Sequence, residues 1–421
     1  MIKTMIERSG MTLFCLPDYI RPYPVLLFLS NMAQGLLAPV LIIFYRKNGI
    51  NLFEIGLVSS IFEISMLLFE IPTGYVADIF GRKLSVLCSF ASFAAAGVTF
   101  AIFKNLTGFV LASIIQGIGF TFISGALQAW AVEILKSNRQ DSSIQNVFAS
   151  GTQSRIAGFL AGSIFGGWLG LAKMNVVWMI YIGINMAALL YAFINMKERR
   201  CDERSESEGA QPETGIKRVF KTAFASSSDH FMTIIILLFA ACIFYEFSMS
   251  PISEYWTVFF AEDLHMPELV FGWVIAVSSI LLIVIIDPAS KFLQTRVSNA
   301  GALVAINIML MAVIFLFGVS FNPIMAIIVY IIYKILASIY EPIRDTFINA
   351  HIQDKYRATV LSVYNMAGSA GEVISGVGIG WVAQKFGIRA SFYASGLSIF
   401  LVIIAFGYII SIYRKADLSS F

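Results

Sequence analysis

The sequence predicts an all-α membrane protein, with twelve transmembrane helices in two six-helix pseudo-symmetric bundles around a central cavity. Three observations support this fold class: an excess of apolar residues, twelve long apolar runs, and a repeat that relates the two halves. Of the 421 residues, 58% are hydrophobic and 13% are charged, and the mean hydropathy is +0.79. A soluble interior of this size cannot bury so much apolar surface, so the surplus is expected to face lipid.

Each predicted span is an apolar run of about 20 residues or more, which is the length that a helix needs to cross a bilayer. The strands of a membrane barrel alternate in polarity over roughly ten residues, whereas these runs are long and unbroken. The expected cores are residues 24–46, 54–78, 84–103, 107–135, 145–171, 174–196, 231–260, 270–293, 299–320, 322–350, 358–384 and 389–413.

The basic residues predict the orientation of these spans. If the first residues are cytoplasmic, twenty of the 29 Lys and Arg residues fall in cytoplasmic segments and six in outer loops. The positive-inside rule then places both termini in the cytoplasm, in a multi-pass protein of the cytoplasmic membrane. The net charge of +3 follows from this topology and gives no reason to expect nucleic acid. Glu7 and Arg8 interrupt the N-terminal segment, so a cleaved signal peptide is not expected.

Cysteine and histidine give no sign of a metal or a cofactor. The four cysteines, Cys15, Cys88, Cys201 and Cys242, are scattered and show no paired spacing. They are expected to be unpaired thiols. The three histidines are also far apart, so we predict no metal site and no cofactor.

A polar segment divides the chain into two halves. Residues 197–230 carry the run KERRCDERSESE together with Pro212 and Gly215, a composition typical of a cytoplasmic linker. The predicted domains are therefore an N-terminal six-helix bundle over residues 1–196, this linker, and a C-terminal six-helix bundle over 231–421.

One constant offset relates the two halves. A shift of 216 positions places Gly272 on Gly56 and Pro288 on Pro72, and it also aligns the inner loops after the fourth and tenth spans. Matches at a single offset over several helices indicate a duplication, which predicts two parallel repeats.

A charged turn between the second and third spans carries the most specific pattern of the chain. Residues 74–83 read GYVADIFGRK, so that Asp78 ends one helix, Gly81 supplies a turn, and Arg82 and Lys83 begin the next. Together with Gly74, these residues match the hairpin motif of the major facilitator superfamily, which the chain resembles over essentially its full length. The resemblance implies a cytoplasmic gate.

The resemblance also implies partners for this gate. Asp78 is expected to face the start of the eleventh helix, near Ala358 and Thr359, when the cytoplasmic side is closed. Arg82 is expected to pair with Glu133 at the inner end of the fourth helix. An acid at a helix N-terminus is favoured by roughly 0.3 to 2 kcal/mol.

Glycines in the fifth helix form a second pattern. Gly158, Gly162, Gly166 and Gly167 resemble the glycine motif of exporters in the superfamily, with Ser163 where those exporters carry proline. Small residues four apart also allow close helix contact, so a plain packing face is the alternative. In the fourth helix the chain departs from the proton-linked exporters, because Ser113 stands where they carry arginine.

Away from their ends, the third, sixth, ninth and twelfth predicted helices contain no Asp, Glu, Lys or Arg, so the charges within the membrane lie on the other eight. A charge at membrane depth costs about 2.5 to 3.5 kcal/mol, so each is expected to face a wet cavity or a partner. The candidates for a proton or substrate pathway are Glu63, Glu70, Arg155, Glu246, Lys334, Glu341 and Glu372.

Structural ion pairs are the alternative for several of these residues. Arg155 can pair with Glu372, and Lys334 with Glu246, whereas Glu341, Arg344 and Asp345 lie close enough on one helix to satisfy one another. Glu63 has no base within two turns on its own helix, and burial favours the protonated form of a carboxyl group. Glu63 is therefore the first candidate to carry a proton or to bind a substrate cation.

These features predict a secondary active exporter that exchanges protons for a small organic molecule by alternating access. No GxxxxGK[ST] sequence occurs, so ATP is not the direct energy source. A proton-coupled importer is the main alternative, and a non-transporting receptor or an intramembrane enzyme is the other. Charges of both signs suit a zwitterionic or amphipathic substrate. We expect a monomer surrounded by lipid and no enzymatic activity.

Overall fold

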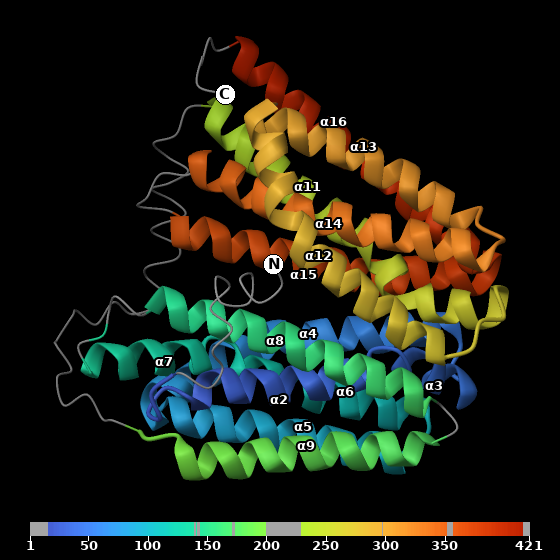
Figure 1. The fold of residues 1–421 in the computed structure, drawn as a ribbon. Helices are drawn as coiled ribbons and strands as arrows, with labels where there is room; N and C mark the ends of the chain where they lie inside the picture. Colours follow the sequence, from blue (N-terminus) through green and yellow to red (C-terminus); the bar gives the residue numbers. More distant parts are fainter. Residues whose placement is uncertain are drawn as a thin grey trace, which may run out of the picture. The chain divides into compact units, whose positions relative to one another are not determined.

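The computed structural model describes residues 16–138, 140, 144–170, 173–198, 229–296, 298–351 and 357–415, and within them it contains helices and no strand (Figure 1). In the first half of the chain the helices are α2 (Pro22–Leu37), α3 (Leu41–Lys47), α4 (Leu52–Phe80), α5 (Arg82–Ile102), α6 (Leu106–Ile123), α7 (Ala126–Ser137), α8 (Ile144–Leu169) and α9 (Met174–Asn195). In the second half they are α11 (Asp229–Val258), the π-helix η3 (Phe259–Asp263), α12 (Leu269–Arg296), α13 (Asn299–Gly318), α14 (Pro323–His351), α15 (Arg357–Phe386) and α16 (Ile388–Lys415).

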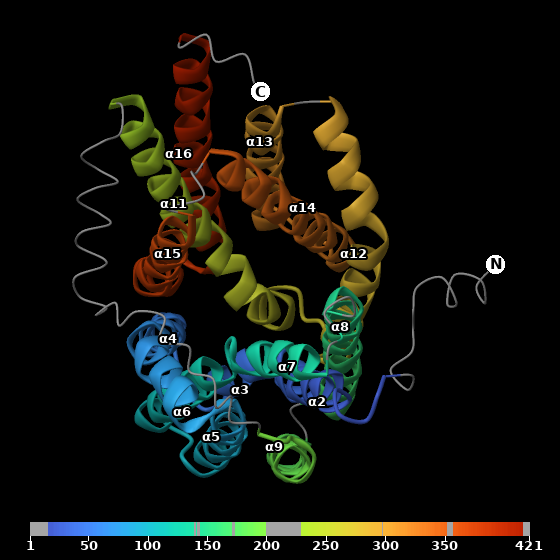
Figure 2. The same ribbon diagram turned by 90° about the vertical axis from the view of Figure 1, so that its left-hand side faces the viewer.

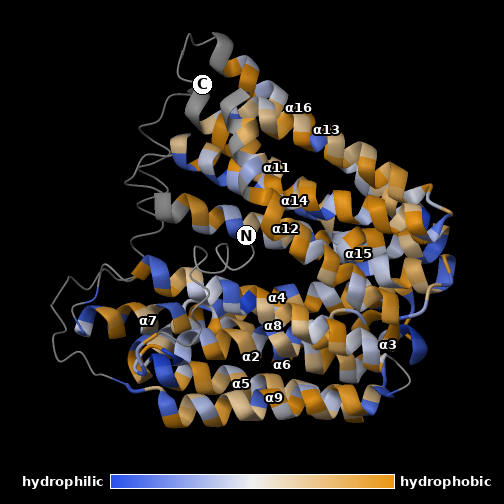
Figure 3. Ribbon diagram, in the orientation of Figure 1, coloured by the Kyte–Doolittle hydropathy of each residue, from blue (hydrophilic) through white to orange (hydrophobic). Residues whose placement is uncertain are grey.

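These helices confirm the twelve predicted spans to within a few residues. Within the described chain, ten spans are both long and apolar enough to cross a membrane. The other two predicted spans are α8 and α15, which are 26 and 30 residues long but carry many glycines and hydroxyl side chains. Most of the helical ribbon in Figure 3 carries the colours of hydrophobic residues.

Two spans contain breaks that the hydropathy pattern did not reveal. The first span is divided into α2 and α3 around Pro39, which has no backbone N–H to donate to the preceding turn. The fourth span is divided into α6 and α7 at Gly125, whose φ of 73° lies in the left-handed region that glycine tolerates best. Each break leaves a short helix at one end of its span.

The second span illustrates how local sequence sets the helix bounds. Asn51 and Glu54 form a capping box at the start of α4: the Glu54 amide donates to Asn51 Oδ1 at 2.9 Å, and the Asn51 amide donates to Glu54 Oε2 at 2.8 Å. These bonds satisfy backbone donors that have no partner within the helix. Gly81, with φ of 101°, ends α4 and allows α5 to start at the next residue.

The chain forms two compact units. The first contains the described residues of Met1–Cys201 together with Ala261–Ser279, and the second contains those of Asp202–Phe260 and Ile280–Phe421. By its contacts, the segment Ala261–Ser279 therefore belongs with the first unit, although it lies in the second half of the sequence.

The two halves share helix bounds and helix contacts. Shifted by 216 residues, α4 falls on 268–296, where α12 spans Leu269–Arg296, and α3 falls on 257–263, where η3 spans Phe259–Asp263. In the first unit α2 packs against α8 and α9, and α5 packs against α6 and α9 (Figure 2). In the second unit the equivalent helices pack in the same pairs: α11 against α15 and α16, and α13 against α14 and α16.

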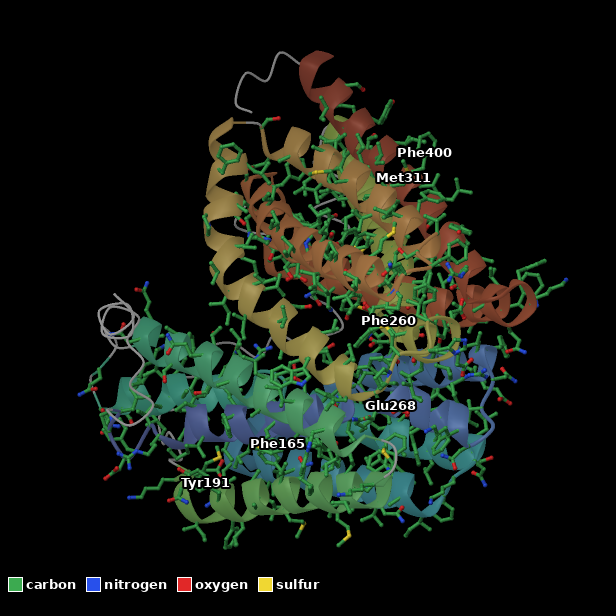
Figure 4. All side chains as sticks on the ribbon, turned by 45° about the vertical axis from the view of Figure 1, so that its right-hand side comes forward. Phe165, Tyr191, Phe260, Glu268, Met311 and Phe400 are labelled. Carbon is green, nitrogen blue, oxygen red and sulfur yellow. The ribbon has the colours of Figure 1, made fainter. Side chains whose placement is uncertain are left out.

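Four helices that have no Asp, Glu, Lys or Arg away from their ends carry much of the exposed apolar surface. They are α5 and α9 in the first unit and α13 and α16 in the second. Exposed side chains on them include Met179 and Leu190 on α9 and Leu397 and Phe400 on α16, the last labelled in Figure 4. In a bilayer these faces are suited to lipid, because the charged residues of these helices, such as Arg82 and Lys83 on α5 and Arg389 on α16, lie at helix ends.

Candidate functional site

The turn between α4 and α5 contains an arginine that contacts two acids. Arg82 Nη2 lies 2.7 Å from Asp78 Oδ1, and Arg82 Nε lies 3.5 Å from Glu133 Oε1 on α7. The contact with Glu133 is the one that the sequence predicts. Because the side chain of Asp78 is 64% exposed, the contacts orient the hairpin more than they stabilise it.

The same hairpin is attached to the end of α9. Lys83 Nζ donates to the Phe193 carbonyl at 2.7 Å and lies 5.3 Å from the centre of the Phe193 ring. Gly81 faces Glu198, and a Cβ at position 81 would overlap the Glu198 carboxylate. Gly74, in contrast, lies within α4 with open space where a Cβ would be. Gly81 is thus the glycine that the turn requires.

The predicted contact of Asp78 with the eleventh helix stays a prediction. The side chains of Ala358 and Thr359 lie outside the described residues, and α15 belongs to the second unit.

The glycines of α8 lie against the backbone of α2. A Cβ added at Gly158, Gly162 or Gly166 would overlap a main-chain carbonyl of α2, at Phe28, Met32 and Leu36 respectively. This is the close approach that small residues four apart permit. The geometry of these three residues fits the packing face that was the alternative to an exporter motif.

The fourth glycine of the pattern makes a different contact. Gly167 faces Gly272 on α12, and a Cβ at position 167 would lie 2.9 Å from the Gly272 Cα. A Cβ on Gly272 would in turn overlap the carbonyl oxygen of Ser163. A proline at position 163 would have the same main-chain carbonyl. The contact with Gly272 therefore does not depend on whether serine or proline occupies this position.

Two ion pairs of the first unit were missed by sequence reasoning. Arg46 at the end of α3 donates from Nε to Glu262 Oε1 and from Nη2 to Glu262 Oε2, both at 2.8 Å. Lys47 Nζ lies 3.3 Å from Oε1 of Glu268, which is labelled in Figure 4. The 216-residue offset was the available signal, because it places Glu262 at the position of Arg46.

The remaining pathway candidates of the first unit do not gather in one cluster. Glu63 is partly buried on α4, where it interacts with another group, while Glu70 on α4 and Arg155 on α8 are exposed. Arg155 and its predicted partner Glu372 belong to different units. That pairing stays a prediction.

In the second unit, the structure brings Glu246 on α11 to Arg344 on α14. Glu246 Oε1 lies 4.0 Å from Arg344 Nη1, with side-chain exposures of 24% for the acid and 17% for the arginine. The alternative pairing of Glu246 with Lys334 is therefore not the one found. Lys334 Nζ lies 6.0 Å from the centre of the Tyr330 ring.

The expectation that Arg344 would be satisfied on its own helix was only partly right. Arg344 contacts Asp345 at 3.0 Å, but Glu341 is exposed, and the guanidinium also extends toward α11. Sequence spacing showed the helix neighbours of Arg344 but not the residue across from it. Glu372 on α15 is partly buried and also interacts with a neighbouring group.

Two glycines of α15 allow this helix to pack closely against α11 beside Glu246. A Cβ at Gly371 would overlap the backbone carbonyl of Ile243, so α15 approaches α11 one turn from Glu246. At Gly368 a Cβ would lie 3.4 Å from both Glu246 Cγ and Cys242 Sγ. Glu246, which belongs to α11, thus lies at the close contact between α11 and α15. Within the described chain, no group of His, Cys, Asp and Glu is placed to hold a metal ion.

A Bacillus subtilis protein named uncharacterized MFS-type transporter YxaM is 25% identical over 378 residues, which cover 89% of this chain and 91% of that protein. Multidrug resistance protein 1 of the same organism is 23% identical over 195 residues, covering 46% of this chain and 49% of the relative.

Solved transporters share the fold. The crystal structure of the nucleoside transporter NupG has a TM-score of 0.73 at 14% identity, covering 94% of this chain and 99% of that one. A peptide transporter, POT, in complex with sulfate also has a TM-score of 0.73 at 14% identity, with 95% and 96% coverage. The family model of the Major Facilitator Superfamily matches residues 25–375 and, in a second match, residues 253–419. The chain therefore belongs to the Major Facilitator Superfamily of membrane transporters.

Proposed function

We propose that this protein exports a small organic molecule in exchange for protons, with Glu246 as the principal proton-exchanging residue. The observation that carries the proposal is the partly buried contact of Glu246 with Arg344 inside a membrane-spanning bundle. A carboxylate at this depth costs several kcal/mol unless a partner compensates it. Proton binding neutralises the acid and removes the negative partner of Arg344.

Such a residue can couple proton binding to substrate binding. A substrate cation and a proton are alternatives for the same carboxylate, so binding of one releases the other. Export follows if the substrate binds from the cytoplasm and the proton from outside, with the two bundles alternating between these faces. Glu63 on α4 and Glu372 on α15 are the further candidates to carry a proton.

The names of several relatives support export. Besides the multidrug resistance protein, the quinolone resistance protein NorA of Staphylococcus aureus is 20% identical over 189 residues, 44% of this chain and 47% of the relative. We also propose that both termini are cytoplasmic and that the monomer is the transporting unit.

Proton flux in reconstituted vesicles tests the coupling. The purified protein is placed in vesicles with an acidic interior, and ethidium and norfloxacin are added outside in turn. We expect the substrate to accelerate loss of the pH gradient in the wild type, and Glu246→Gln to abolish this acceleration. Asp18→Asn is the control, because Asp18 is 89% exposed and contacts only the nearby Arg21 among the described residues.

Three results would count against this function. Substrate-driven flux that survives Glu246→Gln would remove Glu246 from the coupling, and the same measurement on Glu63→Gln and Glu372→Gln would then identify the carrier. Proton and substrate movement in the same direction would indicate the importer. No substrate movement with any compound of a broad panel would favour a non-transporting receptor.

A further inference from the structure

Arg344 lies between the rings of two tyrosines in the second unit. The centre of its guanidinium is 5.8 Å from the centre of the Tyr340 ring and 5.5 Å from that of Tyr364. Tyr340 in turn stacks on Tyr245, with 3.9 Å between ring centres and 13° between ring planes. All three tyrosines are buried. The aromatic side chains therefore fix the plane and position of the guanidinium.

The hydrogen bonds of Arg344 use one edge of the guanidinium. Nε and Nη2 both lie 3.0 Å from Asp345 Oδ1, so the side edge is occupied. At the end edge, Nη1 is 4.0 Å from Glu246 Oε1, which is too long for a hydrogen bond. Among the described residues Nη1 has no acceptor within bonding distance.

A second donor in the same place is also unused. The hydroxyl of Tyr340 is buried and forms no hydrogen bond with the described residues. A buried donor without an acceptor costs about 1 to 3 kcal/mol. Arg344 is partly exposed, so its Nη1 is the donor of this cluster that an acceptor from outside the protein can reach.

We propose that the end edge of Arg344 binds a carboxylate of the transported molecule, and that this molecule is a zwitterion. A guanidinium edge with two N–H groups matches the two oxygens of a carboxylate. The nearby Glu246 carboxylate would repel a lone anion, but it attracts the cationic group of a zwitterion.

This inference rests on the proposed function, since it assigns the substrate class to the same site. Binding of a zwitterion at Arg344 is also compatible with proton exchange at Glu246. The cationic group of the zwitterion and a proton compete for Glu246, while the carboxylate stays on Arg344. Arg344 thus acts as a specificity residue, and Glu246 exchanges the proton.

Ligand binding to the purified full chain tests the proposal without any proton gradient. Two pairs of probes are used, norfloxacin with its methyl ester and 4-(aminomethyl)benzoate with its amide. Each pair differs in the anionic group alone. Affinities come from the rise of the thermal unfolding temperature with ligand concentration. We expect at least one acid to bind about tenfold more tightly than its neutral partner.

Variants of Arg344 and of its neighbour Asp345 then show which residue causes the preference for acids over their neutral partners. Arg344→Gln is expected to bring the ratio of acid affinity to neutral-partner affinity close to one. Arg344→Lys keeps the positive charge but lacks the planar edge with two N–H groups, so it is expected to give an intermediate ratio. Asp345→Asn is the control and should retain the preference, because Asp345 occupies the other edge of the guanidinium.

Equal binding of acids and neutral partners by the wild type would overturn the proposal, as would failure of every acid to bind. A preference that persists in Arg344→Gln would also overturn it. The proposed function fails separately: an Arg344-dependent preference without substrate-driven proton flux would leave the anion site standing and remove proton exchange.

Discussion

Arg46 and Glu262 form a two-bond ion pair between positions that are 216 residues apart, which is the offset of the internal repeat. The same offset places Asp263 on Lys47, so two bases of one repeat correspond to two acids of the other. Two equivalent segments that contact each other would repel if both kept the same charge. Opposite charges at these positions let the end of α3 contact η3.

Reversing one charge of this pair is expected to lower transport, and reversing both to restore it. Arg46→Glu or Glu262→Arg places like charges together, whereas the double variant recovers an ion pair with the opposite polarity. The effect on stability should be small, about 1 kcal/mol or less, because the Glu262 side chain is 44% exposed. The measurement is the initial rate of substrate-driven proton flux for the four proteins. A double variant no faster than the slower single variant would contradict a role for this contact.

The hairpin between α4 and α5 gives a second prediction. Asp78→Asn is expected to lower transport without abolishing substrate binding, because it removes the 2.7 Å contact that orients Arg82. Glu133→Gln should have a smaller effect, since its contact with Arg82 is longer, at 3.5 Å. Labelling of single cysteines on the cytoplasmic side reports the conformational balance. Labelling of the Asp78 variant at the wild-type rate would exclude a gating role for the hairpin.

Hydropathy and charge were sufficient to predict the spans, because a bilayer demands long apolar helices whatever their tertiary contacts. The breaks at Pro39 and Gly125 were missed for the same reason: neither residue changes the apolar character of its span. Glycine spacing on α8 predicted a close contact, and the structure supplies its partner, the backbone of α2.

Ion pairs across helices were less predictable than pairs along one helix. Asp78 and Arg82 are four residues apart, so their contact follows from helix geometry. The contact of Arg344 with Glu246 depends on how α14 and α11 pack, and the spacing of charges on one helix does not contain that information. Lys334 was an equally good partner for Glu246 on sequence grounds, and the position of α14 decided against it.

Gly81 is expected to be essential for stability, whereas Gly74 is not. Gly81→Ala forces a side chain into a backbone with φ of 101° and against the Glu198 carboxylate, which should cost about 1 to 2 kcal/mol or more. Gly74→Ala places a methyl group in open space within α4 and should be neutral or slightly stabilising. Thermal unfolding of the two purified variants provides the comparison, and equal loss of stability in both would contradict this assignment.

The contact between α8 and α2 supports a prediction about packing. Gly162→Ala is expected to lower stability by about 1 to 3 kcal/mol, because the new methyl group would meet the Met32 carbonyl and the Leu36 amide nitrogen of α2. Backbone atoms cannot rotate aside as a flexible side chain can, so the helices must separate. Gly183→Ala on α9 is the matched control, since a Cβ there has open space around it. If the glycine pattern acts in transport through more than packing, Gly162→Ala will slow proton flux further than an equally destabilising change elsewhere in α8. A loss of flux no larger than the loss of folded protein would assign Gly162 to packing alone.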